Sequence, residues 1–262
     1  MKIKLTLEYE GNAFSGWQYQ PNAVTVQGEL GRALEVYLRS LAKKEGLFLD
    51  EIPSINGSSR TDAGVHARGQ IASFSWPEML PFDALRILSA LNGITNCNLS
   101  ILRIEETDDS FDARFSPHYK CYTYRILMRP WSHSLERGQV WRVVTPLNVA
   151  AMIEAARLFR GTHDFTSFRA SDCTAKSTVR TVLLSEFART SPEHLVYVIQ
   201  GNGFLKQMVR IIVGTLVELG QGRRSSDDIP LLLKRKDRRI AGETAPAEGL
   251  TLDWVRYGKW LP

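Results

Sequence analysis

The chain has 262 residues, and with 44% of them hydrophobic it can bury the core of one large domain or of two ordinary ones. Its formal net charge of +5 is mild, but lysines and arginines are clustered, which points to a polyanionic partner without proving one. No signal-peptide block opens the sequence, and no run approaches the ~18 apolar residues of a membrane span. We therefore expect a soluble protein.

The three cysteines, Cys97, Cys121 and Cys173, are far apart and show no CxxC spacing. This pattern indicates neither a disulfide framework nor a zinc site. It is typical of a reduced, cytoplasmic protein.

Strands and helices alternate in the first half of the chain, about residues 1 to 105. Strict alternation of apolar and polar residues predicts a strand at 2–10, and helical spacing predicts a helix from Val26, with Thr25 as its N-cap and an end near Gly46. Further elements are expected as a strand at 70–76, a helix at 81–91 and a strand at 99–104.

The connection from Gly11 to Pro21 carries Phe14, Trp17 and Tyr19. These aromatic residues either pack as a plug or offer a stacking surface, and packing is the commoner role.

A second connection, from Gly57 to Gln70, carries a single carboxylate, Asp62, between small residues, with Arg60 and Arg68 on either side. Its glycines allow a tight turn and close approach by another molecule. Such an aspartate is either an ordinary turn residue or part of a site.

The second half, residues 106–262, contains a run with Tyr122, Tyr124 and Ile126 on one face of a predicted strand. A tyrosine on a strand is most often a packing residue, but the neighbouring Lys120 and Arg125 suit a strand that stacks a base beside a phosphate. We expect the other elements as a helix at 149–159, a polar aromatic loop at 161–169, strands at 178–187 and 195–200, a helix at 204–219 and a strand at 252–257.

The helix predicted at 204–219 is apolar around most of its circumference and contains one arginine, Arg210. A buried guanidinium needs a partner, so Arg210 either pairs with some acid or reaches the helix edge as a snorkelling side chain; in a functional reading it pairs with Asp62. The basic run from Lys234 to Arg239 is either a solvated surface or a phosphate contact.

The histidines His66 and His163 lack the motif of a nucleophile or a metal ligand beside them, so we interpret both as hydrogen-bonding loop residues. Asp164 could cap its own turn.

Several ordered motifs resemble those of the tRNA pseudouridine synthase A family over nearly the whole chain. The motifs are Glu8-Tyr9-Glu10-Gly11, Gly16-Trp17-Gln18, Arg60-Thr61-Asp62-Ala63-Gly64-Val65-His66-Ala67, Phe111-Asp112-Ala113-Arg114-Phe115-Ser116, Lys120-Cys121-Tyr122-Thr123-Tyr124, Asp164-Phe165-Thr166-Ser167-Phe168-Arg169, Gln207-Met208-Val209-Arg210 and Ala247-Glu248-Gly249-Leu250. One departure is the stretch at 44–59, which looks longer than the usual connection of the family.

The resemblance implies an α+β pseudouridine synthase fold, in which helices flank a central antiparallel sheet and the cleft lies between two related halves, 1–105 and 106–262. It implies an isomerase that converts uridine to pseudouridine at positions 38 to 40 of the anticodon stem and loop of tRNA. No cofactor and no metal are required, and the family acts as a homodimer.

The resemblance also implies roles for individual residues. Asp62 matches the catalytic aspartate, Tyr122 the tyrosine beside the target base, Arg210 the arginine that pairs with the aspartate, and Arg60 the residue that fills the space of the flipped nucleotide. His66, in the motif of Asp62, and Arg114, in the motif that begins at Phe111, are further candidate substrate-binding residues.

Two other classes of protein remain as alternatives: an RNA-binding protein without catalysis, and a carboxylate hydrolase of glycosidic bonds, for which no second acid is evident. The sequence leaves open which tRNAs are used, whether Asp62 acts as a nucleophile or as a base, and which group makes the final proton transfer.

Overall fold

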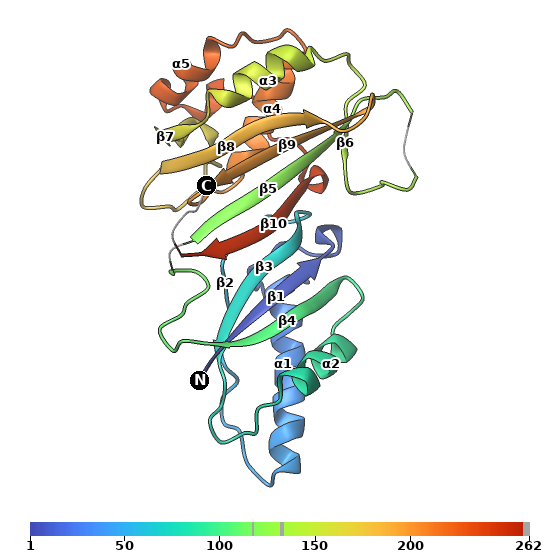
Figure 1. Ribbon diagram of the computed structural model, residues 1–262, viewed down its shortest axis with the longest axis vertical. Coiled ribbons are helices and arrows are strands. Elements are labelled where there is room, and N and C mark those ends of the chain that lie inside the picture. Colours follow the sequence, from blue (N-terminus) through green and yellow to red (C-terminus); the bar gives the residue numbers. More distant parts are fainter. Residues whose placement is uncertain (117, 132–133, 259–262) are drawn as a thin grey trace. The chain divides into compact units, whose positions relative to one another are not determined.

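The computed structural model describes residues 1–116, 118–131 and 134–258 (Figure 1). They form ten strands, five α-helices and four short 3-10 helices, which confirms the α+β class. The chain divides into two compact units, each described by itself below: unit 1 contains Met1–Pro117 and Leu252–Tyr257, and unit 2 contains His118–Thr251. Unit 1 includes the last strand of the chain because that strand hydrogen-bonds to β3, and the expected division after residue 105 stays a prediction.

Unit 1 has the strand order β4-β1-β3-β10, and the short strand β2 pairs with β3. The pairings of β1 with β3 and with β4, and of β2 with β3, are antiparallel. Alternate residues of β1, Ile3, Leu5 and Leu7, are fully buried, so the alternation in the sequence correctly predicts its inward face. The strands are β1 Lys2–Tyr9, β2 Asn56–Gly57, β3 His66–Ser75, β4 Leu99–Thr107 and β10 Leu250–Tyr257.

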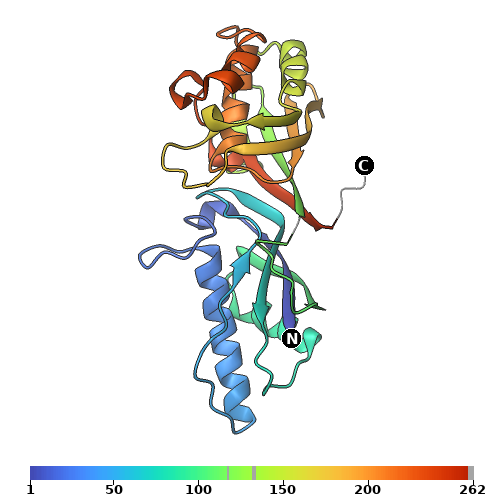
Figure 2. The ribbon, with the colours of Figure 1, turned by 90° about the vertical axis from the view of Figure 1, so that its left-hand side faces the viewer.

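Two helices complete unit 1, α1 at Val26–Lys44 and α2 at Ala84–Ile94. The Thr25 side chain accepts a hydrogen bond from the backbone N–H of Gly28, which confirms the predicted N-cap of α1. Asp83 caps α2 in the same way. Figure 2 shows α1 running along the strands of unit 1.

The aromatic connection after β1 is mainly a packing element. Phe14 and Trp17 are 4% and 1% exposed, and Tyr9 contacts both of their rings. Tyr19, in contrast, is 59% exposed. Packing is therefore confirmed for Phe14 and Trp17 but not for Tyr19.

Unit 2 has the strand order β5-β9-β8-β7, and the short strand β6 pairs with β5. The β5–β6 pairing is parallel whereas β5–β9, β8–β9 and β7–β8 are antiparallel, so the sheet is mixed rather than wholly antiparallel. The strand β7 forms where we expected a loop. The strands are β5 His118–Leu127, β6 Trp141–Arg142, β7 Gly161–Asp164, β8 Val179–Arg189 and β9 His194–Gly201.

The helices of unit 2 are α3 at Val149–Arg157, α4 at Met208–Gly220 and α5 at Asp228–Arg235. Helix α4 begins four residues later than predicted, because Gln207 has a left-handed backbone (φ 61°) that an α-helix cannot include. In α4 every residue except Arg210 is buried, as the apolar pattern indicates. The sequence did not predict α5.

Within the described ranges, none of the helices combines the length and the apolar character that crossing a membrane requires.

Candidate active site

Asp62 lies in the connection between β2 and β3 of unit 1, on a short turn. Its backbone carbonyl accepts a hydrogen bond from the N–H of Val65 at 3.1 Å, and Gly64 inside this turn has a φ of 80° that favours glycine. The Asp62 side chain is half-buried, whereas Thr61 and Val65 on either side are buried. The backbone of the turn is therefore fixed, while Asp62 itself stays partly exposed to solvent.

The aromatic connection after β1 packs directly against this turn. The N–H of Trp17 donates to the carbonyl of Thr61 at 3.0 Å. A Cβ atom at Gly16 would lie 2.8 Å from that carbonyl oxygen, and one at Gly11 would lie 2.3 Å from the backbone of Val65. Only glycine permits so close an approach. Gly11 and Gly16 therefore allow the connection after β1 to pack against the Asp62 turn.

Gln70 of β3 supports the turn from its other side. Its side chain is fully buried and accepts from the Ser58 hydroxyl (2.7 Å) and the Ser59 N–H (3.2 Å). It donates to the Ser59 carbonyl at 2.8 Å and to the Tyr9 hydroxyl at 3.4 Å. A buried amide with this many partners fixes the backbone that leads to Asp62.

His66 follows the turn as the first residue of β3 and is 8% exposed. Its Nδ1 accepts a hydrogen bond from the N–H of Gly11 at 3.1 Å, so Nδ1 carries no proton and a neutral ring holds its proton on Nε2. This contact agrees with the hydrogen-bonding role expected for His66. Its role in substrate binding stays a prediction.

Arg60 and Arg114 are both exposed and lie near each other in unit 1. Burial and then repulsion by the Arg114 charge lower the pKa of Arg60. The Arg114 guanidinium also lies 5.0 Å from the ring centre of Phe115, which is 75% exposed. Two cations and an exposed ring form a surface suited to a phosphate beside an unstacked base.

Tyr122 lies on β5 of unit 2 and is 8% exposed. Its ring contacts the edge of Phe204 with 5.3 Å between ring centres and an interplanar angle of 85°. Phe204 lies in the loop before α4, not in the helix as expected. The tyrosine is thus oriented by a residue that the sequence did not single out for the site.

Arg210 is on α4, and its Nε donates to the carbonyl of Ala245 at 2.8 Å. Its charge also reaches Tyr124 of β5: burial raises the pKa of Tyr124, and the positive Arg210 opposes that shift. Since Tyr122 and Tyr124 share one face of β5, the charge of Arg210 acts on the face of the strand that carries Tyr122.

The predicted site residues therefore fall into two sets. Unit 1 holds Asp62, Arg60, His66 and Arg114, and unit 2 holds Tyr122 and Arg210. The pairing of Asp62 with Arg210 stays a prediction.

Sequence reasoning missed the residues that support these side chains: Tyr9, Gln70, Phe204 and Ala245. An apolar–polar pattern gives little signal for them, since a buried glutamine on a strand reads as an outward-facing residue. The signals available were that Tyr9 lies within the motif Glu8-Tyr9-Glu10-Gly11 and that Ala245 lies two residues before the motif that begins at Ala247.

The Asp164 motif is a structural element of unit 2. Oδ1 of Asp164 accepts from the N–H (3.0 Å) and the hydroxyl (2.6 Å) of Thr166, which confirms the predicted turn cap. Oδ2 pairs with Lys236 at 2.8 Å, and the buried Ser167 hydroxyl donates to the carbonyl of Leu232 at 2.6 Å. The motif thus contacts both α5, at Leu232, and the basic run that begins in the last turn of α5, at Lys236.

In the part of the chain that the structure describes, no three side chains of His, Cys, Asp or Glu gather in a group able to hold a metal ion.

Comparison with known proteins gives consistent matches. A family described as "tRNA pseudouridine synthase" matches residues 155–258. The chain is 40% identical over 256 residues to tRNA pseudouridine synthase A of Myxococcus xanthus, with 98% of this chain and 92% of that protein covered. It is 41% identical to the protein of the same name from Citrifermentans bemidjiense (97% of each chain) and 40% identical to that from Bacillus velezensis (98% and 99%).

Proposed function

Because this chain belongs to the tRNA pseudouridine synthase A family, we propose that it acts on uridines of the anticodon stem and loop, positions 38 to 40, with Asp62 as its catalytic carboxylate. The coarser activity follows from membership: the protein is an isomerase that converts uridine to pseudouridine in tRNA.

The observation that carries the assignment of Asp62 is the construction of its turn. The connection that contains Gly11 and Gly16 packs against this turn on one side and Gln70 holds Ser59 on the other, yet Asp62 itself is only half-buried. A rigid backbone with an accessible acid is what a reaction requires when one group must meet a single atom of a flipped nucleotide. A turn aspartate without function would not need this support.

In the proposed reaction the target nucleotide leaves its stack and enters the site, at a cost of a few kcal/mol. Arg60 fills the space left in the RNA, and Tyr122 lies beside the base. Asp62 acts on the ribose or on the ring, and the uracil detaches, turns and rejoins through carbon. Arg210 pairs with Asp62 and keeps it ionised. The reaction needs no added atoms or electrons, since one glycosidic bond replaces another and the product is an isomer of the substrate.

The test compares unmodified tRNA incubated with the wild type, Asp62→Asn and a control, Asp50→Asn. Asp50 is an exposed acid of the connection between α1 and β2, so its substitution removes a charge without touching the Asp62 turn. We expect pseudouridine with the wild type and the control only, and similar RNA affinity for all three. Pseudouridine formed by Asp62→Asn contradicts the catalytic assignment. Free uracil released by the wild type favours the hydrolase, and binding without turnover favours the RNA-binding protein.

We also propose that the protein acts as a homodimer in the cytoplasm, a property that rests on the resemblance to the family. Light scattering at micromolar concentration should give a mass near twice 29.6 kDa. A mass of one chain at concentrations where the enzyme turns over contradicts the dimer.

A further inference from the structure

The segment Ile240–Pro246, here called the flanking segment, runs beside helix α4 and meets it at three successive points. The N–H of Gly242 donates to the Thr215 hydroxyl at 3.0 Å, and the N–H of Glu243 donates to the Glu218 carboxylate at 2.9 Å. Further along, Ala245 and Arg210 exchange two bonds: Ala245 N–H to the Arg210 carbonyl (3.2 Å) and Arg210 Nε to the Ala245 carbonyl (2.8 Å).

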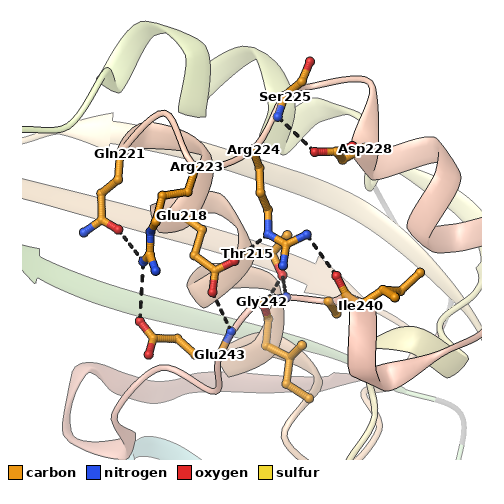
Figure 3. Close-up of polar contacts among 12 residues, drawn as sticks. Thr215, Glu218, Gln221, Arg223, Arg224, Ser225, Asp228, Ile240, Gly242 and Glu243 are labelled. Atoms are coloured by element: carbon orange, nitrogen blue, oxygen red, sulfur yellow. Dashed lines mark hydrogen bonds and ion pairs between the residues drawn. The ribbon is translucent and has the colours of Figure 1, made fainter.

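Charged side chains hold the other end of the flanking segment, as Figure 3 shows. The carboxylate of Glu218, which is 9% exposed, accepts hydrogen bonds from the Arg224 side chain and from the Glu243 N–H. Arg224 also donates to the Ile240 carbonyl at 2.9 Å. Burial would raise the pKa of Glu218, but the Glu243 N–H and Arg224 outweigh it and hold the pKa below its ordinary value. From the 3-10 helix Arg238–Ile240, which leads into the flanking segment, Arg238 donates to the Gly242 carbonyl at 2.9 Å.

Gly214 sets how closely the flanking segment approaches the helix. A Cβ atom at this position would lie 2.0 Å from the carbonyl oxygen of Glu243 and 3.4 Å from the Ala245 nitrogen. Backbone meets backbone here, so a larger residue must displace the segment.

We propose that the flanking segment is a positioning element for Arg210, and that Gly214 and Glu218 are positioning residues of the site. The inference rests on the proposed function, in which Arg210 pairs with the catalytic acid. A guanidinium is planar, and a hydrogen bond at Nε fixes its rotation. The Ala245 carbonyl therefore decides the direction in which Nη1 and Nη2 donate, and the depth of the flanking segment on α4 decides where that carbonyl lies.

The alternative is that the flanking segment only braces a hydrophobic helix. Both readings predict a loss of stability when the contact is broken. Only the positioning role predicts that the reaction also slows because Arg210 is misplaced.

The decisive variant is Gly214→Ala, with Gly31→Ala as its control. Both glycines are in helices, where alanine is favoured by ~1 kcal/mol, but a Cβ atom at Gly31 meets nothing within 4 Å. We expect Gly31→Ala to keep full activity. For Gly214→Ala we expect the single-turnover rate at saturating enzyme to fall about 10- to 100-fold with tRNA affinity unchanged.

A double-mutant cycle with Arg210→Lys then separates the two readings. If Gly214 acts through Arg210, Gly214→Ala adds little to the loss already caused by Arg210→Lys. Fully additive losses, an unchanged rate for Gly214→Ala, or a loss of affinity alone overturns the inference. A normal rate for Arg210→Lys contradicts the proposed role of Arg210 itself, which is a different failure.

If Gly214→Ala does not fold, Glu218→Gln decides. Glutamine keeps an oxygen for the Glu243 N–H but loses the charge that holds Arg224. We expect a smaller loss of rate, again unchanged in affinity and again absent in the Arg210→Lys background. A normal rate for Glu218→Gln, or a loss that adds to that of Arg210→Lys, contradicts the inference.

Discussion

The hydroxyl group of Tyr9 lies 2.8 Å from Oγ1 of Thr61, the residue directly before Asp62. Both side chains are buried, at 3% and 7% exposure, and the Tyr9 hydroxyl also accepts from Gln70. A continuous set of polar contacts thus leads from the centre of β3 through the end of β1 to the Asp62 turn. The sheet of unit 1 therefore fixes the position of the proposed catalytic residue.

We predict that Gln70→Leu destabilises the protein, because it breaks the bonds of the buried Ser58 and Ser59 groups to the amide. Each buried polar group left without a partner costs about 1–3 kcal/mol. Urea unfolding measures the change, and the control Gln20→Leu, at an exposed position, should stay within about 0.5 kcal/mol of the wild type. Equal stability of all three proteins contradicts the role given to Gln70.

Arg60→Ala should slow the reaction less on a tRNA whose target uridine faces a mismatched base. If Arg60 fills the space of the flipped nucleotide, it increases the rate most where the target base is paired, since a mismatched base costs less free energy to flip. Single-turnover rates on matched and mismatched tRNA give the two ratios. Arg39→Ala, which removes an exposed arginine paired with Glu35 on α1, should leave both rates unchanged. The same loss on both RNAs assigns Arg60 to phosphate binding instead.

For Tyr122 we predict that Phe preserves activity better than Ala, because the ring that contacts Phe204, and that we propose stacks beside the base, remains. Tyr122→Ala should also lower the free energy of unfolding by about 3–5 kcal/mol, as large-to-small changes of buried aromatic residues do. Rates must therefore be measured below the unfolding transition. An equal loss of rate in both variants shows that the hydroxyl group itself is needed.

Asp164 should make stability depend on acid pH. Burial would raise the pKa of Asp164, but hydrogen bonds from Lys236, Thr166 and Thr178 outweigh it and lower the pKa well below its ordinary value. A carboxyl group whose pKa is depressed on folding stabilises the protein above its unfolded pKa of about 3.9 and loses that contribution as pH falls further. Urea unfolding at pH 7, 4 and 3 should show a smaller fall for Asp164→Asn than for the wild type. Asp50→Asn should follow the wild type, and parallel curves for all three contradict the prediction.

Periodic patterns predicted most of the regular elements. Helix α1 and its Thr25 cap, strand β1 and the buried face of α4 agree with the structure because each depends on local spacing and on one cap. The start of α4 was wrong, since Phe204 and Leu205 continue the apolar pattern while the left-handed Gln207 interrupts the backbone. The side chains of Phe204 and Leu205 give no sign of that interruption in the sequence.

The motifs identified the candidate residues of the site, but not what holds them. The contacts of Gln70 with Ser59 and of Ala245 with Arg210 join positions 11 and 35 residues apart. Such contacts depend on how elements pack, and single-residue propensities contain no information on them.

The last strand of the chain has a consequence for synthesis. Residues 252–257 of β10 lie beside β3, yet they leave the ribosome only after residues 118–251 of unit 2. Until then the nascent first unit presents β3 as an open edge, and such edges recruit other strands and promote aggregation. A chain cut after Thr251 should keep that edge permanently and depend on chaperones for its solubility.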